Sequence, residues 1–395
     1  MKSTLLTTTA LIAFAGAAAA EVTFSGSATL GYNDTTRTAT TASTSTTTSW
    51  TTSGTTTTTT TVATGDVIDD NQGFYWDANV AVTLSEELDN GLTAGASFDF
   101  DVADMNNGVD LSAGGFVLFL KSDTAALYYG DTAFAAETHW ASAGDMEQDA
   151  FSEADGETVL RGDVSVAMVD ASISMVIADT NAVTAHTASG GSDSYDQLSF
   201  GATADLGQFS VAVAYQEAGD LGPTGNGDYN TAEVFGISVG ATFAGADVRV
   251  AYASDETNSE SSTGVKVSYP VSDAITATAY YVDESNGDAN YGVNVAYADN
   301  GIKITADYQD DQGTRKWSVN GSYDLGNGIS VIGGAEEQSG ATGADVDYYV
   351  GAKYNLGGGA SVLMTYAEDA DGDQKDEIGS GDYKDGITVE VSFAF

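Results

Sequence analysis

Apolar and polar residues alternate along most of the chain, in segments of about ten residues each. In one such segment Ile302, Ile304 and Tyr308 fall at every second position, and Lys303 and Asp307 fall between them. Successive side chains of a β-strand point to opposite faces, so the alternation predicts strands with one apolar and one polar face. Beyond the N-terminal region no run approaches the ~18 apolar residues of a membrane-spanning helix. The pattern therefore predicts an all-β protein.

Two kinds of connection separate the predicted strands. Short turns, such as residues 298–301, 324–328 and 355–359, carry the glycine and asparagine that tight hairpins need at positive φ. Long acidic connections, such as residues 368–386, follow them. The alternation of short turns and long loops is typical of an up-and-down barrel that crosses a membrane. A first strand at residues 22–33, nine short-turn pairs and a last strand predict about 20 strands, and misreading one or two hairpins reduces the number to about 18 or 16.

The tyrosines mark two levels along the predicted strands. Three of them stand just before short turns and three just before long loops: Tyr297, Tyr323 and Tyr354, and Tyr252, Tyr308 and Tyr366. Amphipathic aromatic rings belong at both edges of the ~25 Å apolar band of an outer-membrane barrel. A soluble sandwich also has alternating strands, but it does not require two aromatic levels. We therefore expect a closed antiparallel transmembrane β-barrel.

The first 20 residues have the features of a secretory signal peptide. Lys2 supplies the positive charge, an apolar stretch follows, and alanines at residues 18–20 offer a cleavage site before Glu21. We expect residues 21–395 to form a single barrel domain of an exported protein. The chain has no cysteine, so disulfides cannot contribute to its stability.

The charge is strongly acidic, with 12 Lys and Arg against 58 Asp and Glu and a formal net charge of −46. Such a surface repels phosphates, which excludes nucleic acid as a partner. Acidic disordered proteins lack aromatic residues, whereas this chain has 20 tyrosines, so we expect it to fold. The charge indicates either a solvated surface or an interior that attracts cations.

The two ends and two hairpins carry a family resemblance. The mature start "EVTFSGSATLGYN", the hairpins "SYDLGNGISVIGG" and "KYNLGGGASVLMTYAED", and the terminal "VSFAF" resemble the general diffusion porins of Gram-negative outer membranes, in their alphaproteobacterial branch. The resemblance implies a homotrimer of water-filled barrels in outer-membrane lipid, through which ions and small hydrophilic solutes diffuse passively. It also implies that the final aromatic, Phe395, is the signal read by the barrel-assembly machinery. Sixteen strands are usual in that branch, fewer than the alternation predicts here.

The first long loop, residues 34–71, is rich in threonine and of low complexity. We expect a flexible, solvated outer loop. An alternative function is a non-conducting structural or adhesive surface barrel that acts through this loop, and a third is a secreted soluble β-protein. A heat-dependent shift in gel mobility separates either barrel from the soluble protein, and conduction separates the porin from the adhesive barrel.

A second long loop, residues 131–158, follows the strand that ends in "LYYGD". By resemblance this loop folds into the barrel and forms the pore constriction. It contains no Lys or Arg, and its acidic residues are the candidates to line the aperture: Asp131, Glu137, Asp145, Glu147, Asp149, Glu153, Asp155 and Glu157.

The phase of the strands supplies candidates for the pore wall. Six basic residues fall on inward faces: Arg161, Arg249, Lys266, Lys303, Lys316 and Lys353. Five acidic residues share those faces: Asp77, Asp99, Asp101, Asp163 and Asp307. By resemblance the basic wall residues face the acidic loop and create a transverse field. Rings of carboxylates concentrate cations, so we expect a cation-preferring pore, although most acids of the chain are ordinary solvated loop charges.

No pattern points to catalysis. Residues 236–240 fit G-x-S-x-G but lie in mid-strand, without the strand-to-helix turn and histidine partner that this motif needs. His139 and His186 are the only histidines and cannot form a zinc set. Residues 369–380 lack the glycine at the sixth position of an EF-hand loop. We therefore assign no catalytic residue, cofactor or metal, although acidic outer loops can bind Ca²⁺ weakly and bound calcium occurs in the resembled family.

Overall fold

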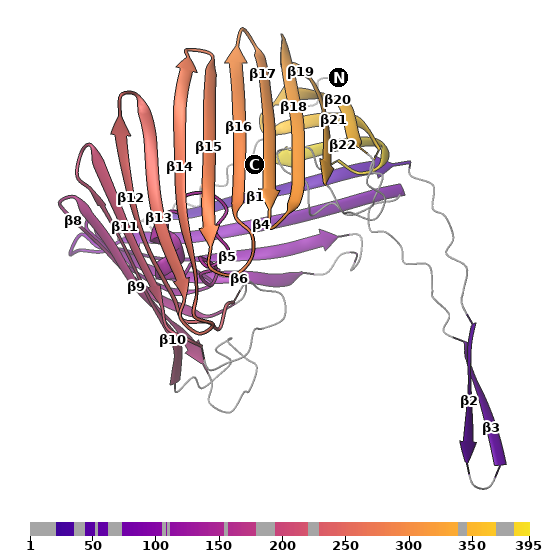
Figure 1. Ribbon diagram of the computed structural model, residues 1–395, viewed down its shortest axis with the longest axis horizontal. Helices are drawn as coiled ribbons and strands as arrows, with labels where there is room; N and C mark the ends of the chain where they lie inside the picture. The colour runs from indigo at the N-terminus through magenta and orange to yellow at the C-terminus, as the bar shows by residue number, and fades with distance from the viewer. Residues whose placement is uncertain are drawn as a thin grey trace.

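The computed structural model shows a β-barrel made from one closed sheet (Figure 1). Twenty strands form this sheet, and two further strands pair with each other in a separate sheet. The structure describes residues 21–34, 44–51, 54–61, 73–104, 108, 111–153, 157–178, 194–219, 229–338, 346–368 and 383–395. The predicted signal peptide, residues 1–20, lies outside the described residues.

The barrel strands are β1 (Glu21–Asn33), β4 (Gly73–Glu87), β5 (Thr93–Asp104), β6 (Ser112–Lys121), β7 (Ala125–Gly130), β8 (Val159–Val166), β9 (Val169–Ala178), β10 (Ser194–Asp205), β11 (Phe209–Gln216), β12 (Val234–Phe243), β13 (Ala246–Asp255), β14 (Glu260–Ser272), β15 (Ile275–Glu284), β16 (Asn290–Asp299), β17 (Ile302–Asp311), β18 (Thr314–Gly326), β19 (Ile329–Gln338), β20 (Asp347–Gly357), β21 (Ala360–Glu368) and β22 (Gly386–Ala394). The separate sheet contains β2 (Thr44–Thr51) and β3 (Gly54–Thr61). The helix α1 spans Ala135–His139.

The sheet closes through the first strand of the chain. From β4 to β22 each strand pairs antiparallel with the next, and β1 pairs with β4 on one side and β22 on the other. The ring therefore has no edge strand, and edge strands are the usual sites of unwanted pairing. The predicted closed antiparallel barrel and its strand number are confirmed, and the strand number exceeds the sixteen of the resembled branch.

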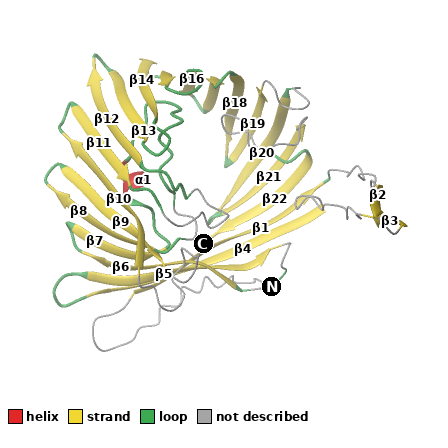
Figure 2. Cartoon of the chain, turned by 60° about the horizontal axis from the view of Figure 1, so that its bottom comes forward, coloured by secondary structure: helices red, strands yellow, loops and turns green. Residues whose placement is uncertain are grey.

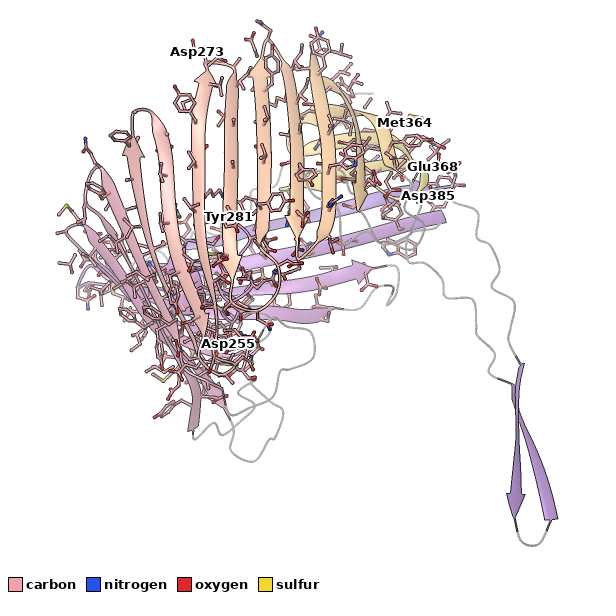
Figure 3. All side chains as sticks on the ribbon, viewed as in Figure 1. Asp255, Asp273, Tyr281, Met364, Glu368 and Asp385 are labelled. Atoms are coloured by element: carbon pink, nitrogen blue, oxygen red, sulfur yellow. The ribbon has the colours of Figure 1, made fainter. Side chains whose placement is uncertain are left out.

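Short connections join the strand pairs from β4–β5 to β20–β21 at one end of the barrel. At the other end the expected alternation with long loops is wrong at three places, because β13–β14, β15–β16 and β17–β18 are also joined by short connections. Side-chain carboxylates tighten two of these turns: Asn258 N donates to Asp255 Oδ1 at 2.8 Å, and Gly313 N donates to Asp310 Oδ1 at 3.1 Å. In Figure 3, Asp273 and Asp255 mark the two opposite ends of the barrel.

The strands separate an apolar outer face from a polar inner face. On β16, β17 and β18 the paired residues Val293, Tyr308 and Trp317 lie on the outer face. One position further along, Asn294 and Asp307 pair on the inner face, where the amide of Asn294 donates to the carboxylate of Asp307. This repeat places apolar side chains toward lipid and polar side chains toward a lumen, as in a membrane barrel. Within the described residues, no helix is long and apolar enough to cross a membrane.

The C-terminus belongs to the barrel wall. Phe395 N donates to Gly26 O at 3.0 Å, and Gly26 N donates to Phe395 O at 2.8 Å, so the last residue extends the pairing of β22 with β1. The Phe395 ring lies over Gly26, where an added Cβ atom would be 3.1 Å from it. The ring is 70% exposed on the outer face, which fits contact with lipid rather than a disordered tail.

The threonine-rich segment contains a hairpin that the sequence analysis did not predict. Strands β2 and β3 pair in register from Thr44 opposite Thr61 to Thr51 opposite Gly54. Threonine is β-branched and favours extended backbone, which explains why a low-complexity threonine run forms strands. The rest of the predicted loop at residues 34–71 lies outside the described residues, except residue 34.

Candidate functional site

The loop after β7 turns into the barrel. Gly130 has φ of 128°, and Asp131 N donates to Phe116 O at 2.8 Å, which directs the chain inward. Figure 2 shows α1 and the loop that follows it on the inner side of the barrel. Two wall glycines allow the loop backbone to approach the wall closely. A Cβ atom at Gly201 would lie 2.1 Å from Ala135 O, and one at Gly264 would lie 2.4 Å from Ala143 O. The loop backbone therefore rests directly on the wall strands.

Wall hydroxyl groups hold the start of α1. Ala135 N donates to Ser174 Oγ at 2.9 Å, and Ala136 N donates to Ser199 Oγ at 2.8 Å. The first N–H groups of a helix have no partner within the helix, so these serines satisfy them from β9 and β10. The polar inner face of the barrel thus provides the hydrogen bonds that the short helix itself lacks.

His139 fixes the other end of α1 to the same wall. Its Nε2 lies 2.7 Å from Ser172 Oγ, and its Nδ1 lies 3.3 Å from Thr203 Oγ1. Burial lowers the pKa of His139 below its usual value, because burial disfavours the charged imidazolium. Over the part of the chain that the structure describes, no group of three or more His, Asp or Glu side chains is placed to hold a metal ion.

The second half of the loop is bonded to β11, β14 and β15. Ser152 N donates to Gln216 Oε1 at 2.7 Å, and Gln148 N donates to Ser262 Oγ at 3.0 Å. Glu284 on β15 accepts a bond of 3.1 Å from the backbone N–H of the loop residue Glu147.

Two amide side chains extend the attachment to β16 and β17. Asn290 Nδ2 donates to Asp145 O at 3.1 Å and to Glu147 Oε1 at 2.9 Å. The Gln309 amide also donates to the Asp145 carboxylate. Together with the bonds from β9 onward, these contacts hold the loop along one continuous wall from β9 to β17.

Apolar packing lies beneath the loop. Trp140 packs against Phe151 in a tilted arrangement with ring centroids 5.6 Å apart, and Phe134 is fully buried. The wall positions below are Ala and Val rather than polar residues, namely Ala212, Ala214, Val234, Ala251, Ala253 and Val282. These residues interrupt the polar inner face where the loop covers it. This interruption was visible in the sequence, and it could have located the loop against β11 to β15.

The loop acids differ in their exposure. Glu147 and Glu153 are exposed, whereas Glu157 is buried with 1% of its surface exposed. Asp131 lies against Gly115, where an added Cβ atom would be 2.4 Å from Asp131 Oδ2. Asp155 lies outside the described residues.

Burial changes the titration of three other loop acids. It raises the pKa of Glu137, and the nearby Glu153 raises it further. It also raises the pKa of Asp145 above its usual value. For Asp149, burial raises the pKa to about 6, although the Trp140 Nε1–H donates a bond of 2.8 Å to its Oδ2. These acids are therefore easier to protonate than carboxylates in water.

Four of the six basic wall residues lie on the same side of the ring as the loop rather than opposite it. Arg249 and Lys266 pair across β13 and β14, and Lys316 on β18 pairs with Gln309, which contacts the loop. Lys303 is exposed on the inner face of β17, at the end next to the short turn, whereas the loop contacts this strand at Gln309. These four residues therefore lie on the loop side of the ring and not across the lumen from the loop.

Arg161 and Lys353 complete the basic set. Arg161 is buried, donates to Ala133 O at 2.8 Å and pairs with Asp163 Oδ1 at 3.0 Å, so it holds the base of the loop. Lys353 is exposed on β20, paired with Ser330.

The wall that faces the loop is acidic. Because β1 stands halfway around the twenty-stranded ring from β13, the strands beside it face the middle of the loop. Asp77 on β4 and Asp99 and Asp101 on β5 are exposed on this wall. Asp307, by contrast, lies on β17 on the loop side and is bonded to Asn294. Acidic groups thus line both sides of the lumen.

Sequence reasoning missed two basic side chains on the inner face. Lys121 on β6 lies with its Nζ 4.3 Å from the centroid of the Phe119 ring. Lys384 lies with its Nζ 3.4 Å from the centroid of the Tyr75 ring. The alternation along β6 could have placed Lys121 on the inner face. Lys384 lies in a loop, where alternation does not show which way a side chain points.

A family model described as Gram-negative porin matches residues 7–375. The chain belongs to this porin family. It is accordingly a channel-forming barrel of the outer membrane of Gram-negative bacteria rather than a member of an enzyme family. The family resemblance inferred from the two ends and the hairpins is confirmed.

Solved structures similar to this porin include three mutants of the Rh. blastica porin. One is 14% identical with a TM-score of 0.39, a second is 14% identical with a TM-score of 0.41, and a third is 13% identical with a TM-score of 0.41. Each comparison covers 95% of this chain and 100% of the other. No curated protein sequence matches the chain.

Proposed function

We propose that this porin forms a water-filled, cation-preferring pore through which ions and small hydrophilic solutes diffuse passively. The proposal rests on one observation: acidic side chains stand on both sides of the lumen. Glu147 and Glu153 are exposed on the loop, and Asp77, Asp99 and Asp101 are exposed on the facing wall. Four basic residues of the wall, Arg249, Lys266, Lys303 and Lys316, lie on strands on the loop side of the ring.

Carboxylates on two facing walls add their potentials across the lumen, which attracts cations and repels anions. An acidic neighbour partly neutralises the positive charge of Lys316, because the Lys316 Nζ lies 3.6 Å from Asp311 Oδ2. Screening limits the reach of these charges to a Debye length of ~10 Å at 0.1 M salt and ~3 Å at 1 M. The preference for cations is therefore expected to be strong in dilute salt and weak in concentrated salt.

The remaining features of the proposal concern assembly. The porin is proposed to be a homotrimer exported with cleavage of its signal peptide, and Phe395 is proposed to be recognised by the barrel-assembly machinery. The position of Phe395 within the β1–β22 pairing supports this role, because a signal in the closing strand is exposed until the ring closes. Mass measurement of the protein in mild detergent tests the trimer.

Swelling of liposomes that contain the purified protein tests the diffusion of solutes. We expect swelling with neutral sugars and with small cationic solutes, and slower swelling with anionic solutes of the same size. A folded protein that permits no swelling would contradict the pore and would favour the adhesive barrel.

A further inference from the structure

The short segment at residues 383–385, which leads into β22, folds against the inner face of the barrel. Asn33 Nδ2 donates to Asp385 O at 2.7 Å and to Thr388 Oγ1 at 2.9 Å, and Asn33 is buried. These bonds tie the segment to the end of β1. In Figure 3, Asp385 lies beside Glu368, the last residue of the neighbouring strand β21.

Tyr383 attaches the same segment to β20. Its ring lies 4.4 Å from the ring of Tyr349, measured between centroids, at an interplanar angle of 46°. Tyr349 is buried on the inner face and donates from its hydroxyl to Asn320 Oδ1 at 2.8 Å. The segment is therefore held at both ends, by an aromatic contact on one side and by the Asn33 bonds on the other.

Between these two attachments, Lys384 lies over the inner wall. Tyr75, Gly31 and Glu390 occupy one row across β4, β1 and β22. The hydroxyl end of the Tyr75 ring lies over Gly31, and its hydroxyl donates to Glu390 Oε2 at 2.8 Å. The Lys384 ammonium stands 3.4 Å above the centre of that ring, a cation–π contact that sets its position.

This row lies on the wall opposite the constriction loop. The loop attaches from β9 to β17, with its middle at β13, and β1 stands halfway around the ring from β13. On this facing wall, Lys384 is the one basic residue among the described positions of β22, β1, β4 and β5 and the 383–385 segment. The charged neighbours that the wall presents there, Asp77 and Glu390, are acidic.

We propose that residues 383–385 form a second inward-folded element of the constriction and that Lys384 is a specificity-determining residue of the pore. Its positive charge reduces the cation preference of an otherwise acidic wall, and it offers the anionic group of a solute a cationic contact on that wall. The inference rests on the proposed function, since it requires a conducting pore with acidic walls.

The first test replaces the charge and measures ion selectivity in planar bilayers at 0.1 M salt. In Lys384→Gln we expect the cation-to-anion permeability ratio to rise about twofold, because the site lies within a Debye length of the passing ion. Arg315→Gln is the matched control: it removes the same charge from a side chain that is 68% exposed at the rim, beside Asp310. We expect the permeability ratio of this control to equal that of the wild type.

A second test changes the charge within a channel that has already folded. The chain has no cysteine, so Lys384→Cys introduces a unique thiol. A cationic methanethiosulfonate reagent should return the selectivity toward that of the wild type, and an anionic one should raise the cation preference further. Arg315→Cys serves as the control and should respond to neither reagent.

The outcomes separate the two proposals. A wild-type protein that does not conduct, or that prefers anions, overturns the proposed function and this inference with it. If the wild type conducts and prefers cations, the inference alone is overturned when Lys384→Gln has the selectivity of Arg315→Gln and when labelling of Lys384→Cys does not change selectivity.

Discussion

The hydroxyl of Tyr75 reaches Glu390 Oε2 at 2.8 Å by crossing the bare backbone of Gly31. The three residues belong to β4, β1 and β22, so this hydrogen bond joins the early part of the chain to its last strand across the point where the barrel closes. A residue without a side chain is needed between the two partners.

Substitution of Gly31 tests this closure. An added Cβ atom at Gly31 would lie 1.9 Å from Tyr75 Cζ, so Gly31→Ala must displace the ring and break its bond to Glu390. We expect a loss of about 1–3 kcal/mol in the stability of the folded barrel, the usual range for overpacking. The temperature at which the folded band disappears in gel electrophoresis measures it. Gly162→Ala is the control, because its nearest contact is Ile173 Cγ2 at 4.0 Å, and equal stability of the two variants would contradict the account.

The contact of the loop with the wall can be tested at Gly264. A Cβ atom there would lie 2.4 Å from Ala143 O, which is backbone and cannot rotate away. We expect Gly264→Ala to push the loop toward the pore axis and to lower the single-channel conductance. Conductance equal to that of wild type and of Gly162→Ala would show that the loop does not rest on the wall at this point.

The loop acids predict a dependence on pH. Burial raises the pKa of Asp149 from 3.8 to about 6, so this side chain gains a proton as the pH falls from 7 to 5. The loop loses negative charge, and we expect the cation preference to decline over that range. Asp149→Asn should flatten the decline, as measured by reversal potentials at several pH values. An unchanged pH profile in this variant would exclude Asp149 as the titrating group.

The same raised pKa has a consequence for stability. A carboxyl group whose folded-state pKa lies above its unfolded value stabilises the fold fully below the unfolded pKa, and this contribution is lost as the pH rises through the folded pKa. For Asp149 the loss falls between pH 3.8 and about 6. Asp149→Asn should therefore remove part of the decrease in stability across this window.

The acids of the facing wall contribute to selectivity independently of the loop. We expect a combined substitution of Asp77, Asp99 and Asp101 by Asn to lower the cation-to-anion permeability ratio severalfold at 0.1 M salt, where the Debye length is ~10 Å. Asp273→Asn, in a short turn at the end of the barrel, should have little effect (Figure 3). A triple variant as selective as wild type would show that the loop acids alone determine the preference.

The number of strands and the face on which each side chain lies were predictable, because both depend on the local sequence pattern. A strand has a strict period of two, so Ile304 and Asp307 could be assigned to opposite faces without knowledge of the fold. Turn chemistry was only partly informative. The turn at Gln312 and Gly313, with φ values of 49° and 87°, was expected to be a long loop, because Tyr308 was grouped with the tyrosines that precede long loops.

The site was less predictable, because it depends on which distant strands face each other. Gly201 and Gly264 support the loop, yet in the sequence they do not differ from other strand glycines. The alternation assigns Arg249 and Lys266 to inner faces, but their position on the loop side follows only from the closed ring and the path of the loop. The position of Lys384 over Tyr75 likewise depends on barrel closure.

Acidic groups on two facing walls are proposed to make the pore prefer cations. The most direct test of this proposal is the reversal potential of the wild-type porin under a KCl gradient, measured at salt near 0.1 M and again near 1 M, where the Debye length falls to ~3 Å. We expect a reversal potential close to the equilibrium potential of K⁺ in dilute salt and a clearly smaller one in concentrated salt. A potential on the anion side in dilute salt would contradict the proposal.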